Sequence, residues 1–415
     1  MRGFQSSEMW LSCTCATWPQ HFCVILLVLA GPATAGRTYL GPLACSDVSC
    51  PSTASGSGRT PNNTNFHLRD VAITAGPDGY YYLTGTSNAG GDGYWTDVWG
   101  VVRVWRSKTP LQPGSYVGGK VIFNISRDCK FCGPATAAGG CRVPNSCARC
   151  GVGDNSSTGG CTPKKDCGGR VWAPELHYLA EKAADVPGSG GWFISYHFHC
   201  AGGGSGVLRS TTASPFGPFT DLVEGVPGGD VSLFRDPADG VVYTISSGSS
   251  IVASRLSKDM SRIENKVTIS PECGSVPCEH TAIGFEGPYV IHVNGTYFLS
   301  SSAFGDRQHH GGPRSVYNND SAAPRDSHYS SFMGRASSLL GPYTDGVGKR
   351  GSWLGLDYGG HNNYFKFQGD IYGTVWYGSD PHHGKDSTPE ERKLVNLPSV
   401  AKMRIDDGRL VEDAS

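Results

Sequence analysis

A strand–turn–strand pattern recurs five times along the chain. Each copy starts with a mostly apolar run, passes through a turn, and ends in a second run that contains aromatic residues; in four of the five copies the first residue is polar. Short turns containing Asp-Gly or Asn-Gly between such runs are typical of β-hairpins. The five predicted hairpins are residues 70–84, 171–196, 230–245, 286–300 and 361–376.

Further strands are predicted after several of these hairpins, at residues 101–106, 206–210, 251–255 and 332–336. Three or four strands per repeat, five times over, is typical of a β-propeller. We therefore expect an all-β, five-bladed β-propeller, with a β-sandwich of similar hairpins as the alternative. In a propeller the first strand of each blade lines the central axis. The leading polar residues would then meet at one mouth, although they lie far apart in sequence.

Composition supports this class and excludes others. The chain has 415 residues, of which 58 are Gly and only 17% are charged, and this argues against helical bundles and coiled coils. A hydrophobic fraction of 38% argues against disorder, and a net charge of −1 gives no reason to expect a nucleic-acid partner. We assign residues 66–415 to one propeller domain and residues 36–65, rich in Ser, Thr, Pro and Gly, to a linker or N-terminal strap.

The N-terminal residues resemble a secretion signal. The apolar run Phe22–Ala30 has nine residues, which is too short to span a bilayer. Ala33-Thr34-Ala35 has the form of a signal-peptidase site, so residues 1–35 are predicted to be a signal peptide. A wrongly assigned start or a signal anchor is the alternative, because the segment before the run is long and contains Glu8. We expect a secreted, monomeric protein without membrane association after cleavage.

Cysteine usage agrees with export. Three of the 15 cysteines lie in the predicted signal, and the remaining 12 are an even number, which predicts disulfides. Seven lie in a Cys-rich insertion, residues 128–167, between the first and second blades. Two Cys-x-x-Cys pairs in it, starting at Cys129 and Cys147, resemble zinc-ribbon spacing, so zinc is the alternative. Five Asn-x-Ser/Thr sequons predict a glycoprotein; they start at Asn62, Asn124, Asn155, Asn294 and Asn319.

The leading polar residues are candidates for catalysis. Four copies begin with Asp70, Asp230, Glu286 and His361, and Glu175 lies near the start of the second copy. Carboxylates gathered in a carbohydrate-sized opening suit hydrolysis of a glycosidic bond, in which one acid protonates the leaving oxygen and one carboxylate activates water.

Aromatic residues near these positions are candidates for sugar stacking. Trp172, just before Glu175, is the strongest of them, because the faces of sugar rings pack on aromatic side chains. We expect Trp172, Glu175 and His361 to contact the substrate.

Five stretches resemble, in order, the five blade motifs of glycoside hydrolase family 43. They read HLRDVAITAGPDGYYYLTGTS, VWAPELHYL, GGDVSLFRDPADGVVYTI, FEGPYVIHVNGTYFLSSS and GHNNYFKFQGDIYGTVWYG, and together they span roughly residues 66–380. The resemblance implies a five-bladed propeller that hydrolyses glycosides with inversion. It departs from the family pattern at Val71 and Val231, where the family usually has proline.

The resemblance also implies a role for each leading residue. Asp70 matches the general base, Asp230 the aspartate that modulates the pKa of the acid and orients the sugar, and Glu286 the general acid. His361 matches a histidine that lies beside a bound calcium in many members, often through water. No cofactor is required, with calcium as a possible exception.

The implied substrates are plant or algal cell-wall polysaccharides or oligosaccharides with arabinan, xylan or galactan side chains. Three alternatives stay open. The first is a non-catalytic carbohydrate-binding propeller, and the second is a structural cell-wall protein. The third is a retaining, invertase-like enzyme, suggested by Phe234–Pro237 (FRDP) together with Glu272-Cys273.

Overall fold

The computed structural model describes residues 37–40, 43, 67–88, 101–124, 170–180, 190–199, 205–248, 250–270, 286–304, 329–344, 354–356, 360–375 and 398–413. The predicted signal peptide and the Cys-rich insertion lie outside these residues, as do all 15 cysteines, Trp95, Trp99 and Glu272. Within the described ranges, no helix is long and apolar enough to cross a membrane.

Four of the five sheets follow the sequence order of their strands. Blade 1 consists of β2 (His67–Ala75), β3 (Tyr81–Asn88), β4 (Val101–Ser107) and β5 (Val117–Asn124). Blade 2 consists of β6 (Arg170–Leu179), β7 (Gly191–His199), β8 (Ser205–Ser210) and β9 (Phe219–Val226). Blade 3 consists of β10 (Gly229–Arg235), β11 (Val242–Ser247), β12 (Val252–Leu256) and β13 (Ile263–Thr268). Blade 4 consists of β14 (Glu286–Val293), β15 (Thr296–Phe304), β16 (Tyr329–Ala336) and β17 (Leu354–Leu356).

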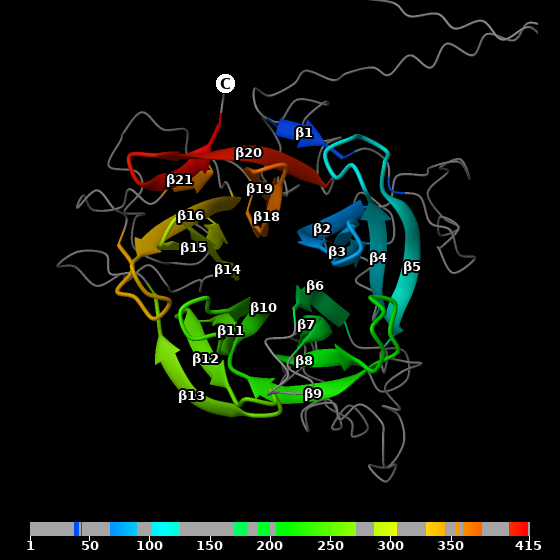
Figure 1. The fold of residues 1–415 in the computed structure, drawn as a ribbon, viewed down its shortest axis with the longest axis horizontal. Helices are drawn as coiled ribbons and strands as arrows, with labels where there is room; N and C mark the ends of the chain where they lie inside the picture. Colours follow the sequence, from blue (N-terminus) through cyan, green and yellow to red (C-terminus); the bar gives the residue numbers. More distant parts are fainter. Residues whose placement is uncertain are drawn as a thin grey trace, which may run out of the picture. The chain divides into compact units, whose positions relative to one another are not determined.

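Blade 5 joins the two ends of the described chain. It contains β18 (Tyr364–Phe367), β19 (Asp370–Val375), β20 (Ser399–Asp406) and β21 (Arg409–Glu412), and β1 (Arg37–Tyr39) pairs antiparallel with β20. Figure 1 shows the five sheets around one centre, with β2, β6, β10, β14 and β18 innermost. The predicted five-bladed β-propeller is thus confirmed, and a strand from the segment predicted as a linker or strap closes its last sheet.

The hydrophobic core is divided among the contacts between neighbouring blades. Side chains of a strand alternate between its two faces, so each sheet buries one face against each neighbour. One cluster joins blades 1 and 2 and includes Tyr82 and Trp192; another joins blades 3 and 4 around Leu299. The remaining three clusters join blades 2 and 3, blades 4 and 5, and blades 5 and 1. The five sheets therefore hold one another in a ring and fix the inner strands.

The inner strands share a backbone kink. One residue of each has a left-handed conformation: Asp70 (φ 52°), Ala173 (φ 44°), Asp230 (φ 46°), Gly287 (φ 53°) and His361 (φ 53°). In blades 1 to 4 the pairing with the second strand shifts register at this residue, as in a β-bulge. In blade 5 the kink precedes the strand, because β18 starts at Tyr364 and not at the predicted His361. We call these five positions the kink residues.

Candidate active site

Asp70 is the kink residue of blade 1, and both of its carboxylate oxygens have partners. The Thr86 hydroxyl donates to Oδ2 at 2.5 Å, and Nδ1 of His361 lies 3.4 Å from Oδ1. The side chain is largely buried. Gly85 lets β3 pass this close, because a Cβ there would lie 2.4 Å from the carbonyl oxygen of Arg69. Asp70 is therefore held in one orientation by groups from blades 1 and 5.

Asp230 and Glu286 come from blades 3 and 4. The backbone N–H of Gly287 donates to Oδ2 of Asp230 at 3.1 Å. This hydrogen bond links blades 3 and 4 at the residue that follows Glu286. Gly287 cannot carry a side chain here, because it has a φ of 53° and its Cβ would lie 2.7 Å from Cγ of His361. Ser301 donates to the Glu286 carbonyl at 2.9 Å and fixes the backbone of that residue.

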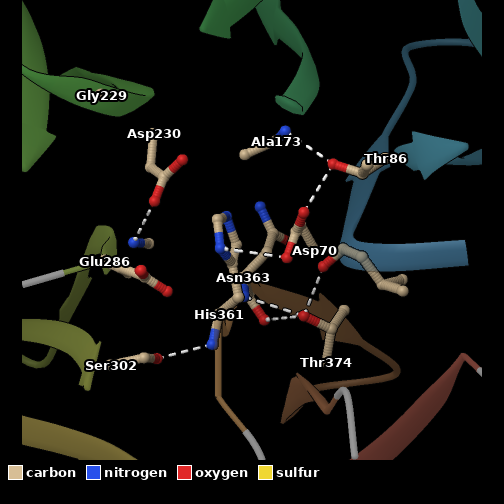
Figure 2. A network of polar contacts seen from close by, with 12 residues as sticks. Asp70, Thr86, Ala173, Gly229, Asp230, Glu286, Ser302, His361, Asn363 and Thr374 are labelled. Carbon is tan, nitrogen blue, oxygen red and sulfur yellow. Dashed lines mark hydrogen bonds and ion pairs between the residues drawn. The ribbon is translucent and has the colours of Figure 1, made fainter. Parts of the chain in front are cut away.

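His361 lies between these carboxylates. Figure 2 shows Asp70 on one side of its ring and Asp230 and Glu286 on the other. Its burial lowers the pKa of the imidazole, but the negative charges of Asp70, Asp230, Glu175 and Glu286 together raise that pKa above the ordinary 6.5. Four carboxylates from four blades thus act on one ring, as the sequence predicted for the leading residues.

Backbone N–H groups of the kinks connect the blades. The Ala173 N–H donates to the Thr86 hydroxyl at 2.7 Å, and the His361 N–H donates to the Ser302 hydroxyl at 2.5 Å. The first contact completes a chain from blade 2 through Thr86 to the Asp70 carboxylate (Figure 2). Blade 2 has no polar side chain at its kink, but its N–H supports the aspartate of blade 1.

Glu175 lies two residues beyond the blade 2 kink and is buried, with 4% of its surface exposed. Its Oε2 is 3.0 Å from Nε2 of His177, whose Nε2 also lies 3.1 Å from the Ser195 hydroxyl. Glu175 therefore acts on the site through its charge near His361, from within the protein. That it touches substrate stays a prediction.

Trp172 immediately precedes the blade 2 kink and is half-buried. Its ring centroid is 6.3 Å from that of His197, at an interplanar angle of 51°. Its proposed stacking on a sugar ring also stays a prediction.

The residues around His361 do not form a calcium site by themselves. Among the described residues, no three His, Cys, Asp or Glu side chains are arranged to hold a metal ion. Nε2 of His361 and Oδ1 of the neighbouring Asn362 are both buried without a hydrogen-bond partner in this part of the chain. Calcium takes six to eight oxygen ligands, more than these two atoms provide, so water would have to supply most of them. We derive no catalytic step through a metal.

Asp236 lies away from these groups, as the hairpin pattern predicts. It is at the turn between β10 and β11, where its backbone N–H donates to the Val241 carbonyl and its Oδ1 accepts from the Tyr297 hydroxyl at 2.5 Å. Asp230 is at the opposite end of β10. The Arg-Asp-Pro sequence thus has a structural role between blades 3 and 4, which disfavours the invertase-like alternative.

Together, the fold and the site define a five-bladed β-propeller with a cluster of carboxylates at its axis. The sequence profile of "Glycosyl hydrolases family 43" matches residues 160–408, which is more than half of the chain. The chain belongs to this family and is a glycoside hydrolase, as the resemblance implied.

Solved structures agree on the fold. An exo-1,5-α-L-arabinanase from a bovine ruminal metagenomic library is 18% identical, with a TM-score of 0.51, and the match covers 84% of this chain and 97% of that one. An α-L-arabinanase from Cellvibrio cellulosa, in complex with arabinohexaose, is 16% identical, with a TM-score of 0.50, over 84% and 95% of the two chains. No curated protein sequence matches the chain.

Three features of the site were not predicted from the sequence: the Thr86 hydroxyl, the N–H of Gly287, and His197 beside Trp172. The Glu-Gly-Pro sequence at residue 286 could have drawn attention to Gly287, because a glycine at a functional position often marks close backbone approach. The other two depend on strand register, which the sequence does not provide.

Proposed function

We propose that the protein hydrolyses O-glycosidic bonds in plant or algal cell-wall polysaccharides or oligosaccharides, with inversion at the anomeric carbon. The observation that carries this proposal is the placement of Asp70, Asp230 and Glu286 around the buried ring of His361 (Figure 2), whose Nδ1 lies 3.4 Å from Oδ1 of Asp70. A lectin would need no such concentration of carboxylates, because each costs free energy to desolvate.

Asp70 is proposed as the general base. The Thr86 hydroxyl and His361 hold its two oxygens, so the carboxylate is fixed before a water molecule binds. The water oxygen forms the new bond to the anomeric carbon, and its proton passes to Asp70. The proton returns to solvent after the product leaves.

Glu286 is proposed as the general acid. It gives its proton to the leaving glycosidic oxygen as the bond between that oxygen and the anomeric carbon breaks, and it regains a proton from solvent. Inverting enzymes separate acid and base by roughly 6.5–9.5 Å to leave room for the water. The position of Asp70 and Glu286 on opposite sides of His361 supports this geometry (Figure 2). Asp230, held by the Gly287 N–H, would orient the sugar and modulate the acid.

The substrate is proposed by class. Arabinan, xylan and galactan side chains fit the family, and the arabinohexaose of the Cellvibrio cellulosa structure makes arabinan oligosaccharides the first compounds to test. The chemistry assigned to the three carboxylates needs no cofactor. Calcium beside His361, held mainly by water, is a separate proposal that chelation would test.

Secretion is proposed from the signal-like residues 1–35, with disulfides in the insertion 128–167 and a monomer as the mature form. The exposed position of Asn294, in the turn between β14 and β15, supports glycosylation at one sequon. Intact-mass measurement of the exported protein, alkylated without reductant, tests the disulfides. Several labelled thiols, or stoichiometric zinc, would contradict them.

The experiment that tests the proposed function is a screen of polysaccharides and aryl-glycosides with the wild type and Glu286→Gln. Loss of the acid should lower kcat/KM about 10²–10⁴-fold on natural linkages, the usual range for general-acid catalysis, and much less on dinitrophenyl glycosides, whose leaving group needs no proton. Proton NMR of the first product formed tests inversion.

The screen also separates the competing functions. Binding of oligosaccharides without turnover by the wild type would favour the non-catalytic propeller. An equal loss on both kinds of substrate would assign the acid to another residue, with Glu175 the next candidate.

A further inference from the structure

One position of the second strand differs sharply among the blades. It is the residue that pairs with the residue just before the kink. Blades 1, 3 and 4 have a small hydroxyl there: Thr86 pairs with Arg69, Ser247 with Gly229, and Ser302 with Glu286. Blade 2 has His197, which pairs with Trp172.

The three hydroxyls all bond to nearby groups of the inner strands. Thr86 links the Ala173 N–H to Asp70, Ser302 accepts from the His361 N–H, and Ser247 donates to the Gly229 carbonyl at 3.2 Å. A small side chain suffices for these contacts. An imidazole at the same register position extends further from the backbone than a Ser or Thr hydroxyl does. His197 can therefore reach groups that the corresponding residues of blades 1, 3 and 4 cannot.

The proton on the His197 ring can be assigned from its neighbours. Nδ1 is 2.9 Å from the Ser205 hydroxyl, and that hydroxyl donates to the Gly228 carbonyl at 2.6 Å. A carbonyl can only accept, so the single hydroxyl proton of Ser205 points to Gly228. Nδ1 must then carry a proton and donate to Ser205. In the neutral ring, Nε2 is left as an acceptor.

The surroundings keep this ring neutral and fixed. Burial lowers the pKa of His197 below 6.5, and the charge of Asp230 offsets only part of that effect. The ring packs against Gly229, where a Cβ would lie 3.4 Å from Nδ1. The side chain is half-buried, and no described residue bonds to Nε2. A rigid acceptor thus lies beside the residue preceding Asp230, next to Trp172.

We propose that Nε2 of His197 accepts a hydrogen bond from one hydroxyl of the sugar that binds beside Asp230, and so contributes to the choice of sugar. This inference rests on the proposed function, since it needs a glycan at the axis. The ligand is a neutral sugar with a hydroxyl donor at that point. The residue touches substrate and moves no proton.

The test uses one substitution that separates the two ring nitrogens of His197 and one control substitution. His197→Asn places an amide N–H near the position of Nδ1, so the bond to Ser205 can be kept while the Nε2 acceptor is lost. His292→Asn is the matched control, because His292 lies on β14 with its ring against Tyr297 and outside the site. Both variants should show thermal unfolding close to the wild type.

The substrates are a set of aryl-glycosides of the sugar found active in the screen, each lacking one hydroxyl. On the parent substrate, His197→Asn should lower kcat/KM about tenfold, the effect of one lost hydrogen bond with its partner left unpaired. On one deoxy substrate the wild type and the variant should agree within about twofold, because the bond is absent in both. His292→Asn should match the wild type throughout.

The outcomes are distinguishable from failure of the proposed function. If the wild type binds oligosaccharides without turnover, the same cycle is measured by calorimetry as Kd, and coupling to one hydroxyl supports the inference. An equal loss on every deoxy substrate, or no loss on the parent, overturns it even when the enzyme is active. Neither turnover nor binding of any glycan by the wild type overturns both proposals.

Discussion

Blades 1 and 2 bend their inner strands at the same place but use the bend differently. Asp70 and Ala173 are both left-handed, with φ of 52° and 44°, and both lie at a register shift between the first two strands. Blade 1 projects a carboxylate from its bend. Blade 2 projects a methyl group, and its nearest carboxylate, Glu175, is two residues further on, beside His177.

The comparison separates what the fold provides from what the side chain provides. The bend is common to all five blades, so it belongs to the architecture. The chemistry depends on which residue occupies it. Blade 2 still serves the site, because the N–H of its kink supports the Thr86 hydroxyl that holds Asp70. A kink without a functional side chain can therefore position the functional one of its neighbour.

The largest expected effect comes from removing the blade 1 carboxylate. Asp70→Asn should lower kcat by about 10²–10⁴-fold, because the proposed base can no longer accept a proton. Asparagine tolerates a left-handed backbone, so folding should be retained. Asp407→Asn is the matched control, since Asp407 is also left-handed (φ 48°) but lies exposed at the turn between β20 and β21. Activity of Asp70→Asn within tenfold of the wild type would remove Asp70 from the mechanism.

The blade 2 carboxylate should matter less to the chemical step. Glu175→Gln keeps the shape of a side chain that is 4% exposed and removes its charge. We expect kcat to stay within about tenfold of the wild type, because the proposed base and acid are both intact. Steady-state kinetics on the same substrate as for Asp70→Asn make the comparison. A loss as large as that of Asp70→Asn would place Glu175 among the catalytic groups.

The contact between blades 1 and 2 through the Thr86 hydroxyl can be tested by substituting two threonines, one at a time. Thr86→Val leaves the Asp70 carboxylate and the Ala173 N–H without the hydroxyl that joins them. We expect a loss of about 1–3 kcal/mol in the free energy of unfolding and a fall of about tenfold in kcat.

Thr84→Val is the control for that substitution. The Thr84 hydroxyl accepts the Leu176 N–H at 3.3 Å, again from blade 2, but it does not contact Asp70. It should cost similar stability and leave kcat nearly unchanged. Equal kinetic effects of the two variants, measured with chemical denaturation as the stability reference, would show that Thr86 does not act through Asp70.

Stability should depend on pH through His361. The surrounding carboxylates raise its pKa above 6.5, so the folded state favours the protonated ring. That contribution is fully present below the unfolded-state pKa and is lost as pH rises through the folded-state pKa. The difference in unfolding free energy between the wild type and His361→Asn should therefore shrink as the pH rises above about 6.5, the unfolded-state pKa, in the presence of a chelator. A difference that stays constant or grows as the pH rises above about 6.5 would contradict the raised pKa.

The sequence predicted the repeated hairpins because their turns carry strong local signals. The Asp-Gly and Asn-Gly sequences at residues 78–79 and 294–295 lie in turns of the structure, as expected. β1 could not be predicted, since three residues in a Ser- and Pro-rich segment show no periodicity, and only pairing with β20 makes them a strand.

The sequence predicted the site residues whose own side chains carry the chemistry. It did not predict those whose place in the site depends on strand register. Asp70, Asp230, Glu286 and His361 each lead a repeat, and the structure brings them together. Aspartate and histidine are enriched among left-handed non-glycine residues, but no sequence pattern required a kink there. The relation between Thr86 and His197 appears only once each is paired with the inner strand, because a shift of one residue changes the face.

The smallest expected effect concerns the cost of the blade 2 kink itself. Ala173 is a left-handed alanine, which costs roughly 1–2 kcal/mol and which glycine would avoid. Ala173→Gly also loses a buried methyl group, so its free energy of unfolding should stay close to that of the wild type. Ala72→Gly removes an equally buried methyl group from a residue outside the left-handed set, and it should destabilise the protein by about 1 kcal/mol.

Chemical denaturation of both alanine variants measures the difference, which isolates the backbone strain from the lost contacts. If the two substitutions cost the same, the blade 2 bend carries no strain. The left-handed conformation of Ala173, fixed by pairing on both sides, would then cost no free energy in the folded protein. If Ala173→Gly is more stable than Ala72→Gly by about 1–2 kcal/mol, the packing of the five blades holds Ala173 in a conformation that alanine disfavours. The same packing of the blades would then hold Asp70 and Asp230 in their orientation.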